Sequence, residues 1–219
     1  MVKPGKTVSR WPGAKCCGRW ENHQRSSGST SPVLNQVVTT AACSNGTING
    51  GETIKSGQFL CFTGTVNGGV TIQSGGGLYL SGARINGAIT STSATTLIVC
   101  GSTINGNIGA TGTTGYVLIG DGGDDGVPGC ANNTINGNVT LTNNKGGFEF
   151  AGNTVTGTVT LTGNTGSGPT SEDASPEVEG NKITGSLSCA TSNSPAITDG
   201  GQKNSVTGTK SGQCAGSGF

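Results

Sequence analysis

The chain of 219 residues contains few charged residues, few aromatic residues and a single histidine, His23. Charged residues make up 11% of the sequence and aromatic residues 4%. So few large side chains would bury too little surface to offset the chain entropy of a compact globule. An ordinary globular core is therefore not expected. No apolar run is long enough to cross a membrane, and no apolar core of a secretory signal is recognisable.

Glycine is abundant instead, with 42 residues, and many of them belong to a recurring phrase. The phrase is Ile or Val, then Asn or Thr, then Gly, and it ends at Gly50, Gly68, Gly87, Gly106, Gly137, Gly157, Gly185 and Gly208. The steps between successive glycines are 18, 19, 19, 31, 20, 28 and 23 residues. A base period near 19 residues, with insertions on some turns, is typical of a solenoid.

Apolar and polar residues alternate after each phrase, as in 139–141 and 159–161, both of which read Val-Thr-Leu. A period of two belongs to strands. A second apolar run follows in the early coils, for example 78–80 and 97–99, after turn-forming glycines. Each coil is therefore expected to be strand, turn, strand, turn, with apolar columns inward and threonines in water.

The pattern predicts an all-β, right-handed parallel β-helix of about eight coils. A β-sandwich of antiparallel hairpins also fits the strand spacing. It gives no reason, however, for the same residue at the same place in every unit. We therefore favour the solenoid over residues 41–219, with loop insertions near 120–130 and 166–179.

Residues 1–40 break the pattern and form a basic, irregular N-terminal arm. They carry six Lys or Arg residues against one acid, Glu21, although the whole chain has a net charge of only +1. Trp11 and Trp20 lie here and are candidate attachment residues, toward an acidic polymer or a neighbouring protomer. A flexible extension is slightly favoured over an attachment role for this segment. The solenoid has no basic stripe, so we do not expect nucleic acid as a partner.

Eight cysteines are present, without metal-ligand spacing. Their positions relative to the coils predict the disulfides Cys43–Cys61, Cys100–Cys130 and Cys189–Cys214, and leave the state of Cys16 and Cys17 open. Disulfides imply an oxidising compartment, hence a secreted or cell-surface protein. Reduced, buried thiols are the alternative.

Acidic residues of the solenoid gather in the two insertions. Asp121, Asp124 and Asp125 supply oxygens that Ca²⁺ could use, but their spacing favours a solvated loop, and we expect no cofactor. The second insertion, 166–179, reads as an exposed acidic loop. Because the solenoid has no histidine and no clustered carboxylates near its strands, we do not expect an enzyme.

Five of the eight phrases carry asparagine as their middle residue, and these asparagines form a column: Asn49, Asn67, Asn86, Asn105 and Asn136. We expect their side chains to bond one another or the turn backbone along the stack. The alternative is a ligand-binding ladder.

The phrases 135–139 (Ile-Asn-Gly-Asn-Val) and 104–108 (Ile-Asn-Gly-Asn-Ile), with the ending 207–216, resemble those of small, disulfide-bearing, secreted bacterial right-handed β-helix proteins. The resemblance covers about four fifths of the chain. It implies fold and export only, because that group has no assigned activity. In architecture the chain is also similar to pectate-lyase-like β-helices.

We therefore expect an extracellular or cell-surface structural protein, a rigid rod for display, adhesion or filament assembly. Its partners would be copies of itself or a surface glycan. The alternatives are a polysaccharide-binding or polysaccharide-cleaving β-helix protein, and an ice-binding protein acting through its threonine columns.

Overall fold

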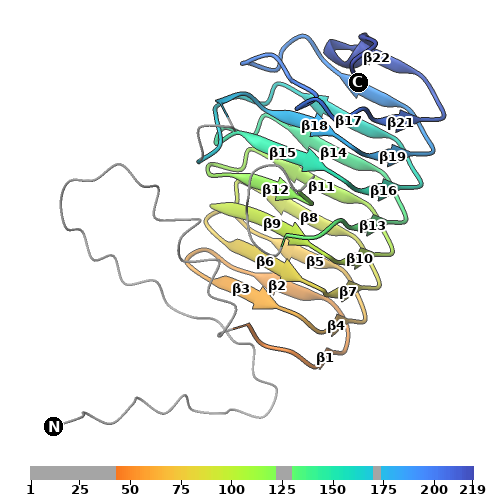
Figure 1. Ribbon diagram of the computed structural model, residues 1–219. Helices are drawn as coiled ribbons and strands as arrows, with labels where there is room; N and C mark the ends of the chain where they lie inside the picture. Colours follow the sequence, from red (N-terminus) through yellow and green to blue (C-terminus); the bar gives the residue numbers. More distant parts are fainter. Residues whose placement is uncertain (1–42, 122–129, 170–173) are drawn as a thin grey trace, which may run out of the picture.

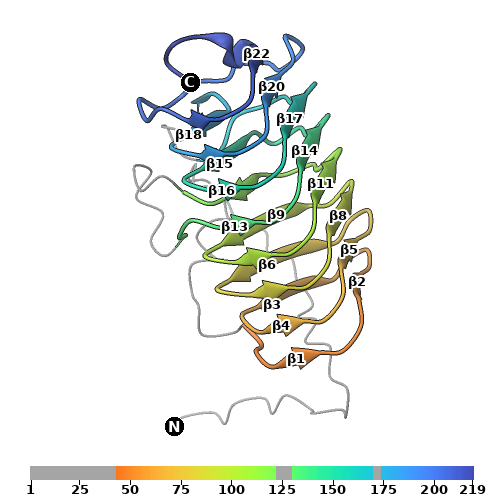
Figure 2. The same ribbon diagram turned by 90° about the vertical axis from the view of Figure 1, so that its right-hand side faces the viewer.

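The computed structural model describes residues 43–121, 130–169 and 174–219, and these form a parallel β-solenoid. The chain winds through three parallel sheets, two of eight strands and one of six (Figure 1). Every strand pairs with the equivalent strand of the neighbouring coil, so the coils stack along one axis (Figure 2). Seven steps of about 4.8 Å give the stack a length of about 34 Å. The predicted β-solenoid is confirmed.

Two of the sheets have eight strands each. In the dipeptide sheet every strand has two residues: β1 (Thr47–Ile48), β4 (Thr65–Val66), β7 (Arg84–Ile85), β10 (Thr103–Ile104), β13 (Thr134–Ile135), β16 (Thr154–Val155), β19 (Lys182–Ile183) and β21 (Ser205–Val206). The threonine sheet consists of β2 (Glu52–Ile54), β5 (Val70–Ile72), β8 (Ile89–Thr92), β11 (Ile108–Thr111), β14 (Val139–Thr142), β17 (Val159–Thr162), β20 (Leu187–Cys189) and β22 (Lys210–Gly212). The repeated phrase spans the corner between these two sheets.

The six-stranded sheet forms the third side. It consists of β3 (Phe59–Phe62), β6 (Gly77–Ser81), β9 (Thr96–Cys100), β12 (Val117–Ile119), β15 (Phe148–Ala151) and β18 (Glu177–Glu179). A short 3₁₀ helix, η3 (Gln213–Ala215), follows β22. The sequence predicted two strands a coil, whereas most coils have three. A strand of two residues is too short to show the alternation of apolar and polar residues by which strands are recognised in a sequence. The strands of the dipeptide sheet are therefore not distinguishable from the repeated phrase in the sequence alone.

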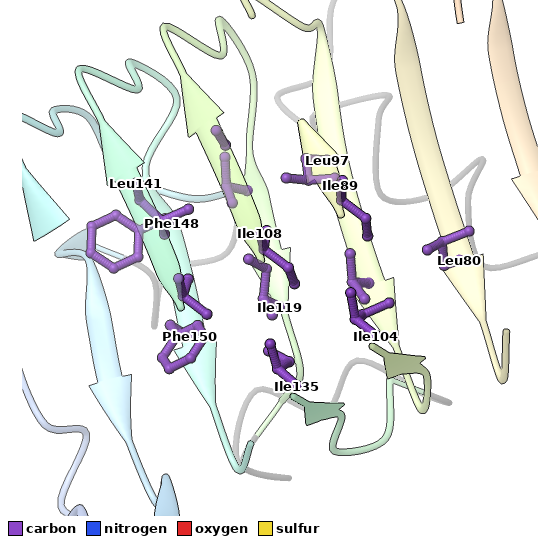
Figure 3. Close-up of a cluster of buried hydrophobic side chains, with 14 of the residues drawn as sticks. Leu80, Ile89, Leu97, Ile104, Ile108, Ile119, Ile135, Leu141, Phe148 and Phe150 are labelled. Carbon is purple, nitrogen blue, oxygen red and sulfur yellow. The ribbon is translucent and has the colours of Figure 1, made fainter. Parts of the chain in front are cut away.

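The core is a narrow column of mostly aliphatic side chains that point inward from all three sheets, with Phe148 and Phe150 among them (Figure 3). Ile104, Leu141 and Leu97 come from the three different sheets, and each has no exposed surface. In the threonine sheet the inward residues alternate with threonines that are exposed or half-buried. Each fully buried aliphatic side chain contributes about 1.5–3 kcal/mol. The column therefore replaces the large core that this composition cannot build.

Residues Glu177–Glu179 correct one expectation from the sequence. They were assigned to an exposed acidic loop, but they form β18, and their side chains are 9%, 0% and 0% exposed. Val178 pairs in register with Phe150 and joins the core. The single inward apolar residue Val178, between two glutamates, is enough to form a strand because the edge of β15 is available for pairing. The insertion therefore ends before Glu177.

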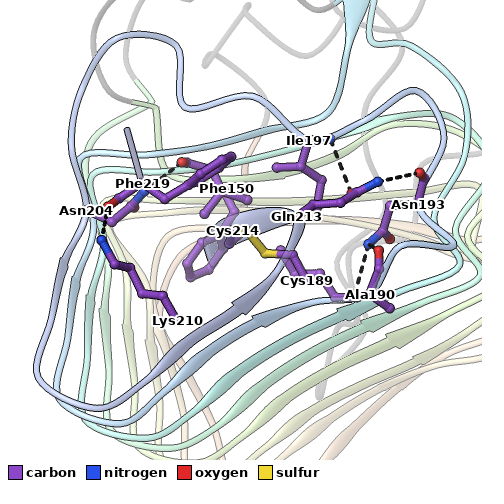
Figure 4. The surroundings of a disulfide bond; sticks show 12 residues. Phe150, Cys189, Ala190, Asn193, Ile197, Asn204, Lys210, Gln213, Cys214 and Phe219 are labelled. Atoms are coloured by element: carbon purple, nitrogen blue, oxygen red, sulfur yellow. Dashed lines mark hydrogen bonds between the residues drawn. A yellow bond between two sulfur atoms is a disulfide. The ribbon is translucent and has the colours of Figure 1, made fainter. Parts of the chain in front are cut away.

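The predicted disulfides Cys43–Cys61, Cys100–Cys130 and Cys189–Cys214 all form. Their Cα–Cα distances are 4.6, 4.6 and 5.4 Å, within the range that a disulfide spans. The last one joins Cys214 of η3 to Cys189 of β20 at the C-terminal end (Figure 4). There Gln213 Nε2 donates to the backbone oxygen of Asn193 at 3.0 Å, and Phe219 packs against the core.

Both ends of one inward column carry a charge. Glu52 stands where Val70 stands in the next coil, and Lys210 stands where Leu187 stands in the coil before it. The Lys210 ammonium group donates to the backbone oxygen of Phe219. Glu52 is already buried, at 4% exposure, whereas a further coil stacked on the C-terminal end would have to bury the half-buried Lys210, which is costly. Inward charges of this kind protect open strand edges from pairing with other chains.

We predict that replacing Gly106 by alanine destabilises the solenoid by about 1–3 kcal/mol through overpacking. A Cβ built at Gly106 would lie 2.7 Å from the carbonyl carbon of Gly87 and 2.8 Å from the backbone nitrogen of Ala88. The matched control is Gly109→Ala, because a Cβ there meets nothing within 4 Å. Denaturant unfolding measures both variants. Equal stabilities would contradict the tight stacking of the corner glycines.

Candidate functional site

The outer face of the threonine sheet is the most regular surface of the solenoid. One column runs in register through Thr53, Thr71, Thr90, Gly109, Thr140, Thr160, Ser188 and Ser211. A second column runs through Thr92, Thr111, Thr142 and Thr162. The threonines are exposed or half-buried. The second row therefore presents hydroxyl and methyl groups on four consecutive coils, and the first row does so on three of these four.

The spacing of this face follows from strand geometry. Side chains two residues apart on one strand are separated by about 6.6 Å, and adjacent coils by about 4.8 Å. Gly109 leaves a gap in the first row, and Lys55 and Gln73 follow the first two strands of the sheet. Between Thr90 and Thr162 the two rows carry no charge. Such a face can contact a flat, repetitive and uncharged partner.

The asparagines predicted to form a column do so at the corner between the dipeptide and threonine sheets. Asn67 Nδ2 donates to Asn49 Oδ1 at 2.8 Å, and each further member donates to the one before it at 2.9–3.1 Å, through Asn86, Asn105 and Asn136. The amides bond one another, so their hydrogen-bonding groups serve the stack. We find no reason to assign them a ligand.

Two further asparagine ladders lie inside the solenoid, and the sequence reasoning missed them. One consists of Asn133, Asn153, Asn181 and Asn204, and the other of Asn144, Asn164 and Asn193. All seven side chains are buried, at 7% exposure or less. Each asparagine of the first ladder directly precedes a strand of the dipeptide sheet. The recurrence of asparagine at this position of successive coils is the feature of the sequence that could have predicted the ladder.

Asn153 shows how completely a buried ladder amide is bonded. Its Nδ2 donates to the backbone oxygen of Ile119 at 2.7 Å and to Asn181 Oδ1 at 3.1 Å. Its Oδ1 accepts from Asn133 Nδ2 at 2.9 Å and from the backbone nitrogen of Asn133 at 3.2 Å. Every hydrogen-bonding position of the amide is used. The ladder therefore joins four successive coils and supplies partners to buried backbone groups at the corner.

The carboxylates of the six-stranded sheet lie on its outer side. Glu149 pairs in register with Glu177, and the two side chains are 1% and 9% exposed. Tyr116 Oη donates to Glu149 Oε2 at 3.3 Å, and Thr198 Oγ1 donates to Glu177 Oε1 at 3.3 Å. Two acids are thus brought side by side, although the sequence placed them in separate elements. Their burial leaves little surface for a substrate to reach.

The remaining predicted residues are placed only in part. Asp121 is buried at 5% exposure, while Asp124 and Asp125 lie outside the described residues, so the weak calcium prediction stays a prediction. Within residues 43–121, 130–169 and 174–219 no group of three His, Cys, Asp or Glu side chains could hold a metal ion. Trp11, Trp20, Cys16 and Cys17 lie outside the described ranges. No helix among the described residues is long and apolar enough to span a membrane.

We predict that Asn153→Ala lowers the free energy of unfolding by about 3 kcal/mol or more. The change leaves several buried donors and acceptors without partners, each at a cost of about 1–3 kcal/mol. The control is Asn105→Ala in the solvent-facing ladder, where water replaces the lost bonds and the loss is about 1 kcal/mol or less. Denaturant unfolding followed by circular dichroism compares the two. A similar loss in both would refute the special role of the buried ladders.

In comparisons with protein-family models, with curated proteins and with solved structures, nothing matches this chain.

Proposed function

We propose that the protein is an extracellular or cell-surface structural module, a stiff rod that holds a flat, uncharged face toward a partner. The observation that carries the proposal is the continuous bonding between coils. Two eight-stranded parallel sheets connect every coil to its neighbours, and a six-stranded sheet, three asparagine ladders and three disulfides add bonds between particular coils. In a solenoid every coil is stabilised by those next to it. Such a stack resists local opening, which suits a spacer or a display element.

Export is supported by the cysteines and by the resemblance of the phrases to secreted bacterial β-helix proteins. The six described cysteines are all disulfide-bonded. Disulfides persist in oxidising compartments and are rare where thiols are kept reduced. Two of the pairs stand at the first and last coils, where a solenoid has neighbours on one side only. There they secure the ends against fraying.

Adhesion through a side face is favoured over filament growth from the ends. Lys210 opposes the addition of a coil at the C-terminal end, since it stands half-buried in an inward column. The threonine sheet presents the broadest regular surface, and a surface polysaccharide is a partner of matching chemistry. Cleavage of a glycan is less well supported, because Glu149 and Glu177 are buried and paired carboxylates must flank the bond that they hydrolyse.

Ice binding is a second candidate, and one observation favours it. The pairs Thr90/Thr92, Thr140/Thr142 and Thr160/Thr162 lie on coils in register, and Thr111 continues the second row between them. A rigid array of hydroxyl and methyl groups can order water at regular intervals. Threonine also belongs on exposed strands by propensity alone, so the array needs a direct assay.

The structural proposal predicts where the protein resides and in which redox state. Producing cells are fractionated while free thiols are blocked with an alkylating reagent, and the protein is then analysed by mass spectrometry. We expect it in the medium or at the cell surface, with Cys43, Cys61, Cys100, Cys130, Cys189 and Cys214 unmodified. Retention inside the cell with alkylated cysteines would overturn the proposal. Native mass and electron microscopy of the same sample then separate a single rod from an assembly.

The ice-binding candidate predicts that micromolar protein slows ice recrystallisation and that Thr140→Lys abolishes the effect. A lysine at Thr140 places a charge in the middle of the rows. The control is Thr154→Lys, which changes an equally exposed threonine of β16 on the dipeptide sheet. Loss in both variants would point to a nonspecific effect. If the unmodified protein has no effect, ice binding is excluded and the structural proposal is untouched.

A further inference from the structure

The outer side of the six-stranded sheet carries a column that is buried although it points away from the core. Cys61, Tyr79, Ile98, Leu118, Glu149 and Glu177 follow one another in register across β3, β6, β9, β12, β15 and β18 (Figure 1). They alternate with inward residues such as Leu78 and Leu97. Side chains that point outward from a sheet of a solenoid normally face water. Tyr79, Ile98 and Leu118, however, are only 6%, 2% and 1% exposed.

These side chains form a second hydrophobic cluster, separate from the core. It comprises Tyr79, Ile98, Cys100, Tyr116, Leu118 and Cys130, with Cys43, Phe59 and Cys61 packed against it. Apart from Tyr116, Cys43 and Cys130, its members lie on strands of this sheet. Among the described residues no strand or helix belonging to another part of the chain contributes to the cluster. The cover over this face must therefore come from elsewhere.

The segment of residues 1–42 is attached at the right place and is long enough to cover the outer face of the six-stranded sheet. Their last residue is followed by Cys43, which is bonded to Cys61 at the head of the column. From β3 to β18 there are five strand spacings, about 24 Å in all. An extended chain covers that distance with about 8 residues. Forty-two residues therefore reach the far end of the column and can return.

The positive charge of this segment also matches the acidic end of the column. The column begins with apolar side chains and ends with Glu149 and Glu177 side by side. The first 40 residues carry six cationic side chains against one acid, and they hold both tryptophans of the chain. The insertion near Cys130 contributes Asp124 and Asp125 instead, which would repel the two glutamates. Tryptophan over apolar residues and arginine or lysine beside buried carboxylates are favourable pairings.

We propose that residues 1–42 lie as a strap along the outer face of the six-stranded sheet of their own chain. The disulfide Cys43–Cys61 fastens the strap at its end. Trp11 and Trp20 supply the apolar contacts to Tyr79, Ile98 and Leu118, and basic residues lie against Glu149 and Glu177. The strap hides an apolar face that would otherwise associate with other molecules. This inference is independent of the proposed structural role.

Tryptophan fluorescence of the full chain tests the proposal, because its only tryptophans are Trp11 and Trp20. We expect blue-shifted emission and acrylamide quenching that is severalfold weaker than in denaturant. Ile98→Asp places a charge under the strap without touching the core, so quenching should rise toward the denatured value. Thr140→Asp, exposed on the threonine sheet, is the matched control and should change nothing. Circular dichroism verifies that both variants fold.

Zero-length cross-linking then identifies which chain supplies the strap. A carbodiimide joins neighbouring lysines and carboxylates, and an equal mixture of ¹⁵N-labelled and unlabelled protein distinguishes links within one chain from links between chains. We expect links from Lys3, Lys6 or Lys15 to Glu149 or Glu177 within one chain, lost in the Glu149→Gln/Glu177→Gln variant. Links between labelled and unlabelled chains would assign the face to a second copy and overturn the proposal. Tryptophans quenched as in denaturant, or protected but indifferent to Ile98→Asp, would overturn it as well.

Discussion

The strand residues of this protein stack on their equivalents in the next coil, at the strand spacing of about 4.8 Å, and the rest of the structure depends on that constraint. A position can hold only a residue that tolerates its equivalents in the coils above and below. Gly106 illustrates the limit, because a Cβ there would lie 2.7 Å from the carbonyl carbon of Gly87. Repetition therefore follows from the geometry of stacking, and the composition rich in glycine, threonine and asparagine follows from repetition.

Stacked amides compensate for the narrow core. A buried polar group is costly unless all its hydrogen bonds are made, and a column of identical asparagines satisfies this condition at every step. Asn153 bonds the coil before it, the coil after it and the backbone oxygen of Ile119. The same side chain in an isolated coil would lack most of these partners. The ladders thus make the stability of each coil depend on its neighbours, which favours a stiff rod over a chain of loosely joined units.

The three sheets give the solenoid three chemically different sides. The threonine sheet is broad, regular and almost uncharged, whereas the six-stranded sheet carries an apolar column that ends in two acids. Charges at Glu52 and Lys210 stand in an inward column at the two ends. A partner is therefore expected at a side face. The surface proposed for adhesion and the surface proposed for the strap lie on different sheets, so one can be altered without the other.

The repeat period, the alternation of apolar residues and the cysteine positions were sufficient to predict the solenoid, its eight coils and its three disulfides. They also placed Asn49 through Asn136 in one column, since a period of one coil is visible in a linear sequence. The third sheet, the buried asparagine ladders and the strand Glu177–Glu179 emerged only from the folded chain. Whether an outward residue such as Leu118 or Glu149 meets water depends on what lies across that face. Contacts across a face are made between segments that are separated in sequence, so no local pattern predicts them.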